Sequence, residues 1–228
     1  MYQPMLYVHW KQIRVGLIPF IVASFALPIL MVQGLGVAPG MNSTSMEAYR
    51  MVNEFQIFLP VFPLLAGGIG MMLALSAWNW DHQQKHVWAL SLPLGRWEYA
   101  MLKMGAGAVL AMLPVTALWI GAHIAAASVE LPVGLNAYPN QLALRFALAT
   151  LLSYSLLFAM AAGTIRTTVW IVTGVIGLTF LGAMANDFLA MYFDYFTRVH
   201  VVGEFYAWLV QTPGPFEVFA GNWALIDV

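Results

Sequence analysis

Long apolar runs alternate with short polar segments along this chain of 228 residues. An α-helix needs about 20 mainly apolar residues to cross the hydrocarbon core of a bilayer, which is about 30 Å thick. Five stretches meet or approach this length: 15–35, 55–78, 104–128, 142–162 and 169–185. The pattern predicts an all-α, polytopic membrane helical bundle in which residues 1–228 form a single transmembrane domain. We expect the prolines inside these stretches to kink the helices rather than break them, because neighbouring helices satisfy the backbone groups that proline frees.

The composition supports the same class of protein. Hydrophobic residues make up 61% of the chain and charged residues only 8%, and the mean hydropathy is +0.78. Soluble domains carry about 25% charged residues, so this chain is expected in a membrane, as a multi-pass protein of the inner (plasma) membrane with the lipid bilayer as its first partner. The formal net charge of −1 argues against nucleic acid as a partner. With no cysteine, disulfides, thiolate metal sites and cysteine nucleophiles are excluded.

The basic residues predict the orientation. With the N-terminus inside, six of them fall on inner segments and three on outer segments, as the positive-inside rule favours. The inner set is Lys11, Arg14, Lys85, Arg96, Lys103 and Arg166, and the outer set is Arg50, Arg145 and Arg198. Five spans then leave the aromatic-rich segment 186–228 outside. This segment either forms interfacial helices that cap the outer mouth of a cavity or is a packed surface loop, and the sequence leaves both open.

The first 14 residues predict an amphipathic helix in the plane of the inner interface. On a helical wheel one face is apolar or aromatic, and Lys11 and Arg14 lie away from it. The residues of that face are Met5, Leu6, His9, Trp10 and Ile13.

The inner loop 79–103 predicts a short polar helix between two spans. Asp81 is a good N-cap for a helix that runs to about Leu92, Pro93 then makes a turn, and a new helix begins at Arg96. A polar helix held at the inner face is what a membrane subunit would offer to a soluble partner. The candidate partner-binding residues are Asp81, His82, Gln83, Gln84, Lys85, His86 and Arg96.

The chain carries no motif for catalysis or nucleotide binding. A G-x-x-x-x-G-K-[ST] loop requires a glycine directly before its lysine, and no lysine of this chain has one. We therefore expect no ATP site and no enzyme activity in this chain. His82 and His86 have a spacing that can hold a metal, but only Asp81 offers a third ligand, and we expect solvated side chains and no metal.

His123 is the only ionisable side chain well inside a predicted span. It is a candidate functional residue, but the favoured interpretation is a neutral imidazole hydrogen-bonded between helices near the outer end of the third span. A transport pathway would be lined by weakly polar groups, which favours a hydrophobic or amphipathic cargo. The candidates besides His123 are Ser24, Thr116, Ser153, Ser155 and Thr173. Small residues at 66–70, and Gly174 and Gly177, predict close contacts between helices.

The loop residues Leu90-Ser-Leu-Pro93-Leu-Gly-Arg96-Trp-Glu-Tyr99, followed by Lys103, resemble the cytoplasmic loop of ABC-2 type transporter permeases. In that family a Leu-Pro-x-x-Arg turn follows the coupling helix between the second and third spans. The amphipathic N-terminal helix is similar to the family's connecting helix, and the outer aromatic segment is similar to its extracellular helices. Those helices precede a sixth span, and none is visible after Ala185. Either the sixth span lies beyond this sequence or the resemblance fails at the C-terminus.

The resemblance implies a permease, expected to be an exporter, that carries no cofactor and works with a separate ABC ATPase subunit holding ATP and Mg. The coupling helix would sit in a groove of that ATPase, and a second permease subunit, identical or paralogous, would complete the pathway. The alternative is a non-transporting subunit that anchors or assembles a larger membrane complex.

Overall fold

The fold is taken from a computed structural model. It describes residues 2–34, 60–83, 95–129, 134–163, 216–220 and 222–227, together with the single or paired residues 131, 166, 169–170 and 173–174. The chain divides into two compact units, of which the first is Met1–Ala159 with Asn222–Val228 and the second is Met160–Gly221. Each unit is described by itself.

The described residues of the first unit form four long helices: α1 (Tyr2–Gly34), α3 (Val61–Gln83), α5 (Arg96–Ala127) and α6 (Pro139–Ala161). All four are long and apolar enough to cross a membrane, which supports a mostly helical membrane protein. They coincide with the first four predicted spans. The fifth, 169–185, lies largely outside the described residues, although the few residues described there are helical.

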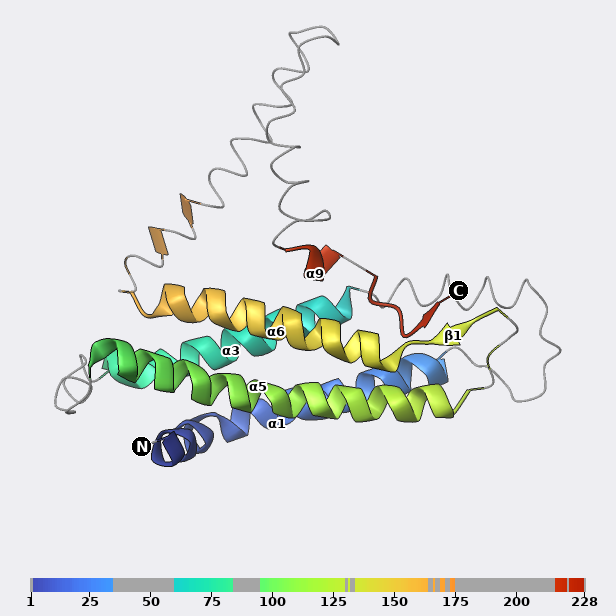
Figure 1. The fold of residues 1–228 in the computed structure, drawn as a ribbon, viewed down its shortest axis with the longest axis horizontal. Helices are drawn as coiled ribbons and strands as arrows, with labels where there is room; N and C mark the ends of the chain where they lie inside the picture. The colour runs from blue at the N-terminus through green and yellow to red at the C-terminus, as the bar shows by residue number, and fades with distance from the viewer. Residues whose placement is uncertain are drawn as a thin grey trace, which may run out of the picture. The chain divides into compact units, whose positions relative to one another are not determined.

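Successive helices run in opposite directions along one axis (Figure 1). The start of α1, the end of α3, the start of α5 and the end of α6 therefore meet at one end of the bundle. We call this the loop end, because the segment 84–94 connects α3 to α5 there. The opposite end carries a two-stranded antiparallel ladder of β1 (Asn136–Ala137) and β2 (Ile226–Asp227), and we call it the strand end.

Local sequence sets the helix starts. The backbone N–H of Gly95 donates to Glu98 Oε2 at 3.4 Å, and the acidic side chain also suits the positive end of the helix dipole. The predicted helix start at Arg96 is thereby confirmed. Pro139 opens α6 at the first helical position, where its missing N–H costs no hydrogen bond.

The prolines do not break the helices. Pro19 and Pro28 lie inside a continuous α1, and Pro114 lies inside a continuous α5. Pro60 precedes α3 and Pro63 lies in its first turn, where the backbone N–H would have no partner inside the helix. Residues 55–59 of the second predicted span, 55–78, lie outside the described residues.

The largest difference from the sequence prediction lies at the end of α3. This helix continues to Gln83, so Asp81 lies inside its last turn and does not begin a separate helix. The N-cap role predicted for Asp81 is therefore wrong. The predicted helix beyond it, from residue 84 to about Leu92, lies outside the described residues.

The first turns of α1 confirm the predicted two-sided pattern. His9 and Ile13 are each 3% exposed, whereas Lys11 and Arg14 are exposed. In Figure 1 these turns point away from the direction that the rest of α1 follows. Their apolar face packs against protein, so the burial of this face needs no lipid.

Glycines set the closest approaches between helices. A Cβ on Gly121 of α5 would collide with the carbonyl oxygen of Phe25 of α1 and lie 3.0 Å from its carbonyl carbon. A Cβ on Gly70 of α3 would collide with the Ser153 hydroxyl of α6 and lie 2.7 Å from the backbone nitrogen of Tyr154. The close contact predicted from the small residues of the second span is confirmed at Gly70.

Candidate functional site

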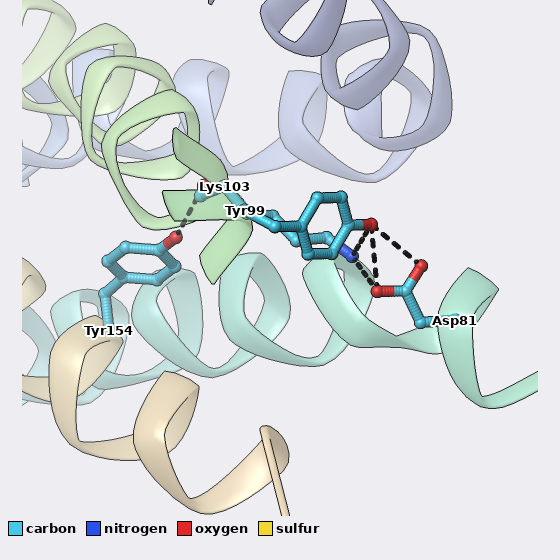
Figure 2. Close-up of polar contacts among 4 residues, drawn as sticks. All are labelled: Asp81, Tyr99, Lys103 and Tyr154. Carbon is cyan, nitrogen blue, oxygen red and sulfur yellow. Dashed lines mark hydrogen bonds and ion pairs between the residues drawn. The ribbon is translucent and has the colours of Figure 1, made fainter. Parts of the chain in front are cut away.

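A buried ion pair joins α3 to α5 at the loop end. The Lys103 Nζ lies 2.6 Å from Asp81 Oδ2, and the two side chains are 6% and 2% exposed (Figure 2). Asp81 comes from the last turn of α3 and Lys103 from the second turn of α5. Burying two charges is costly unless they are paired and hydrogen-bonded, so each of these residues depends on the other.

Tyr99 completes the arrangement, and we call Asp81, Tyr99 and Lys103 the ion-pair cluster. The Tyr99 hydroxyl lies 3.0 and 3.1 Å from the two carboxylate oxygens of Asp81, to which it donates. It accepts a hydrogen bond from Lys103 Nζ at 3.3 Å. Tyr99 and Lys103 are four residues apart and share one face of α5, so both reach the same carboxylate.

Aromatic rings enclose the ammonium group. Lys103 Nζ lies 4.7 Å from the centre of the Trp78 ring and 5.1 Å from that of Tyr99. The Trp78 ring packs against Phe158 of α6 at 5.1 Å between centroids. Cation–π contacts of this kind strengthen when water is excluded, so the rings stabilise the charge in place of solvent.

A second tyrosine ties α6 to the same turn of α5. The hydroxyl of the fully buried Tyr154 donates to the carbonyl of Met104 at 3.1 Å and is 3.4 Å from that of Lys103 (Figure 2). Gly107 makes room for this ring, because a Cβ there would collide with the Tyr154 hydroxyl. The start of α5 is thus fixed to both α3 and α6.

His9 brings α1 to this end of the bundle. Its side chain is buried and lies close enough to Lys103 to experience the charge of that residue. Within the described part of the chain, neither His9 Nε2 nor Trp78 Nε1 has a hydrogen-bond partner. Buried polar atoms without such a partner are uncommon in a well-packed interior.

The ion-pair cluster is a structural link between α3 and α5. Among the described residues, no group of three or more His, Asp or Glu side chains could hold a metal ion. Asp81 and Lys103 neutralise each other, and Tyr99 hydrogen-bonds to both of them. The cluster joins the two helices on either side of segment 84–94.

The partner-binding residues predicted from the sequence are only partly visible. The Asp81 carboxylate is engaged inside the bundle, whereas Gln83 and Arg96 are exposed at the two ends of the connecting segment. Gln83 donates to Asn79 Oδ1 at 3.2 Å. His82 lies in the last turn of α3, and Gln84, Lys85 and His86 lie outside the described residues.

His123 makes the interhelical hydrogen bond that the favoured interpretation predicted. Its Nε2 lies 3.1 Å from Asn140 Oδ1 of α6, and Trp119 Nε1 donates to the same oxygen at 2.8 Å. Since the indole N–H can only donate, the atom it faces is the amide oxygen, and His123 must donate from Nε2. The residue joins α5 to α6 near the strand end.

The other predicted pathway residues differ in exposure and in hydrogen bonding. Thr116 is exposed on α5, and its hydroxyl donates to the carbonyl of Leu113 at 2.9 Å. Ser153 is buried, donates to the carbonyl of Ala149 at 2.7 Å and lies 3.3 Å from that of Ala66 on α3. Ser155 is half-buried on α6, Thr173 is exposed in the second unit, and the buried Ser24 hydroxyl has no hydrogen-bond partner among the residues that the structure describes.

Sequence reasoning missed the Asp81–Lys103 pair, although a signal for it exists. Asp81 lies three residues after the second predicted span and Lys103 one residue before the third. Adjacent antiparallel helices bring such positions to the same depth, and opposite charges there can pair. The sequence interpretation assigned Asp81 to the start of a separate loop helix and therefore did not pair it with Lys103.

Comparisons with known proteins add no relative to this picture. No family model, no curated protein and no solved structure matches the chain. The function is therefore argued from the residues and the geometry described above.

Proposed function

We propose that the chain is the membrane-spanning permease subunit of an ATP-driven ABC transporter of the ABC-2 type, working as an exporter. A separate ATPase subunit binds ATP and Mg, and a second permease subunit, identical or paralogous, completes the pathway. The observation that carries the proposal is the ion-pair cluster, which fixes both ends of the segment that resembles a coupling loop.

A loop that transmits work must be firmly attached to the elements that it moves. Segment 84–94 begins three residues after Asp81, and α5 begins at Arg96, three residues before Tyr99. The pair between Asp81 and Lys103 prevents α3 and α5 from separating when the segment is pushed. Displacement by an ATPase then moves the two helices together, as a rigid-body transition between inward-open and outward-open states requires.

The exposed groups at the two ends of this loop are suited to contact a soluble partner. Arg96 is exposed at the first position of α5, and Gln83 is exposed at the end of α3. A guanidinium group pairs well with carboxylates or phosphates on a partner. Gln84 and Lys85 lie between them in the sequence and are the next candidates for contact.

The first test is to identify the partner. The chain carries an affinity tag, is purified from its native membrane in mild detergent, and its companions are identified by mass spectrometry. We expect an ATPase subunit with a Walker A motif to co-purify in stoichiometric amounts, and ATP hydrolysis to reside in that subunit. Purification without any ATPase would contradict the permease function.

The second test separates a permease from an anchoring subunit. The double variant Gln84→Glu/Lys85→Glu reverses the charge of the proposed docking segment, and Gln141→Glu adds a carboxylate at the strand end as a matched control. The proposal places Gln84 and Lys85 on the surface that meets the ATPase, and surface substitutions change stability by less than about 0.5 kcal/mol. We therefore expect the double variant to reach wild-type expression and melting temperature. It should nevertheless lose most of the bound ATPase, whereas the control keeps it. Full ATPase binding by the double variant would favour the anchor alternative with another docking surface.

A further inference from the structure

The segment 222–227 packs onto the strand end of the first unit, although the whole second unit precedes it in the chain. Its apolar side chains are almost completely buried: Trp223 is 2% exposed, Leu225 0% and Ile226 1%. We call residues 222–227 the strap. A short segment with this degree of burial is seated in the bundle rather than resting on its surface.

The strap contacts the starts of both α3 and α6. The Trp223 ring stacks on Phe62 in the first turn of α3, with 6.4 Å between centroids and 7° between planes. Arg145, in the second turn of α6, donates to the carbonyl of Asn222 at 2.7 Å. Between these contacts the strap pairs with β1, and Tyr138 N donates to the carbonyl of Leu225 at 2.8 Å.

The strap also holds its own shape. Asn222 Oδ1 accepts a hydrogen bond from the backbone N–H of Ala224 at 2.9 Å, which closes a local turn. The Asn222 amide donates to the Asp227 carboxylate. A preformed segment of this kind can leave and reseat as a unit, and its two-residue ladder offers few backbone bonds to break.

The helix α3 connects the loop end to the strap. Asp81 fixes one end of α3 to α5, and Phe62 at the other end of the same continuous helix sits on Trp223. A helix that moves as a rod therefore changes the Phe62–Trp223 contact when its far end is displaced. The start of α6 is held by the same strap through Arg145.

We propose that the strap is a releasable closure of the strand end, and that the starts of α3 and α6 separate only when residues 222–227 unseat. This inference rests on the proposed function, because the movement that releases the strap is the one that the ATPase drives. The contact set points to a gate because the strap contacts the starts of both helices, through Phe62 of α3 and Arg145 of α6.

The absence of native cysteine allows a clean crosslinking test. The bond from Tyr138 to Leu225 makes the neighbouring pair Ala137 and Ile226 a non-hydrogen-bonded pair, with a typical Cα separation of about 4.5 Å. This separation falls within the range that a disulfide spans. The variant Ala137→Cys/Ile226→Cys therefore locks the strap on oxidation, and each single variant serves as its control.

Two measurements are made on the complex with its co-purified ATPase in proteoliposomes. The first is protection of the cysteine pair from a maleimide-polyethylene glycol reagent added after mild oxidation and denaturation in detergent, which we expect to be nearly complete for the pair and not to occur in either single variant. The second is ATP hydrolysis, which we expect to fall at least tenfold in the oxidised pair, to return with reductant, and to stay unchanged in both single variants.

Labelling of Ile226→Cys alone reports the release directly. We expect little reaction with the maleimide reagent at rest and at least a tenfold faster reaction when ATP is added. Failure of the pair to crosslink would overturn the strap while leaving the permease proposal intact. Equal labelling rates with and without ATP, or full ATP hydrolysis by the locked pair, would overturn the gate. A chain that purifies without an ATPase would overturn the function on which the gate depends.

Discussion

At the scale of single residues, the Asp81–Lys103 pair raises the question of why two charges are buried at the end of an apolar bundle. Buried ion pairs add little net stability compared with apolar residues of similar volume, whereas losing one partner is strongly destabilising. The pair therefore acts mainly by excluding other arrangements of α3 against α5. Tyr99, which hydrogen-bonds to both oxygens of the Asp81 carboxylate, further restricts how α3 packs against α5.

This account predicts a non-additive double-mutant cycle. Lys103→Met leaves the Asp81 carboxylate buried with only Tyr99 as partner, and we expect the free energy of unfolding to fall by about 3–5 kcal/mol. The double variant Asp81→Leu/Lys103→Met removes both charges and should recover most of that loss. Thermal unfolding of the purified protein in detergent, followed by circular dichroism, gives the comparison.

Tyr99→Phe is the control for this cycle. It keeps both charges and removes one hydroxyl, so the expected loss is about 1 kcal/mol. A cycle in which the two single changes and the double change simply add would show that the pair does not form.

At the scale of helices, the long apolar runs were sufficient to predict the four long elements, because a bilayer imposes their length and composition. The start of α5 at Arg96 was also predictable, since proline and glycine precede it and Glu98 can cap it. The end of α3 was not, because Asp81 is a good N-cap as well as a good ion-pair partner. The position of Lys103 beside Asp81 in the folded chain decides between these two roles.

The functional residues were predicted less completely than the helices, because their roles also depend on which residues lie opposite them in space. Small hydroxyl residues such as Ser153 fit a polar pathway and also fit a helix contact, and the difference depends on which helix lies opposite. The His123 hydrogen bond was predicted correctly because an ionisable group inside a span has few alternatives to an interhelical partner.

Glycine positions give a test of the helix packing. Gly121→Ala places a methyl group against the Phe25 backbone of α1, which cannot move aside as a side chain does. We expect α1 and α5 to shift apart, with a loss of about 1–3 kcal/mol measured by thermal unfolding.

Gly67→Ala on α3 is the matched change, because none of the described residues places an atom within 4 Å of its added Cβ. Alanine has a higher helix propensity than glycine, so this variant should be neutral or more stable by up to about 1 kcal/mol. Equal effects at Gly121 and Gly67 would contradict the packing of α1 against α5.

At the scale of the whole molecule, the two ends of the first unit differ in charge. Lys11, Arg14, Arg96 and Lys103 all lie toward the loop end, whereas Arg145 lies toward the strand end. The difference agrees with a loop end on the inner side of the membrane, as the positive-inside rule predicts. It also puts the ion-pair cluster near the soluble ATPase of the proposed function, and the strap on the opposite side.

The orientation predicts the reactivity of two cysteine variants in intact cells. Gln83→Cys is exposed at the loop end, and Ser128→Cys is a nearly isosteric change at an exposed position just after α5, at the strand end. With an impermeant maleimide, Ser128→Cys should be labelled and Gln83→Cys should react only after the membrane is permeabilised. The cysteine-free parent provides a zero background. Labelling of Gln83→Cys in sealed cells would reverse the topology, remove the loop from the reach of an inner ATPase, and thereby contradict the permease function along with the orientation.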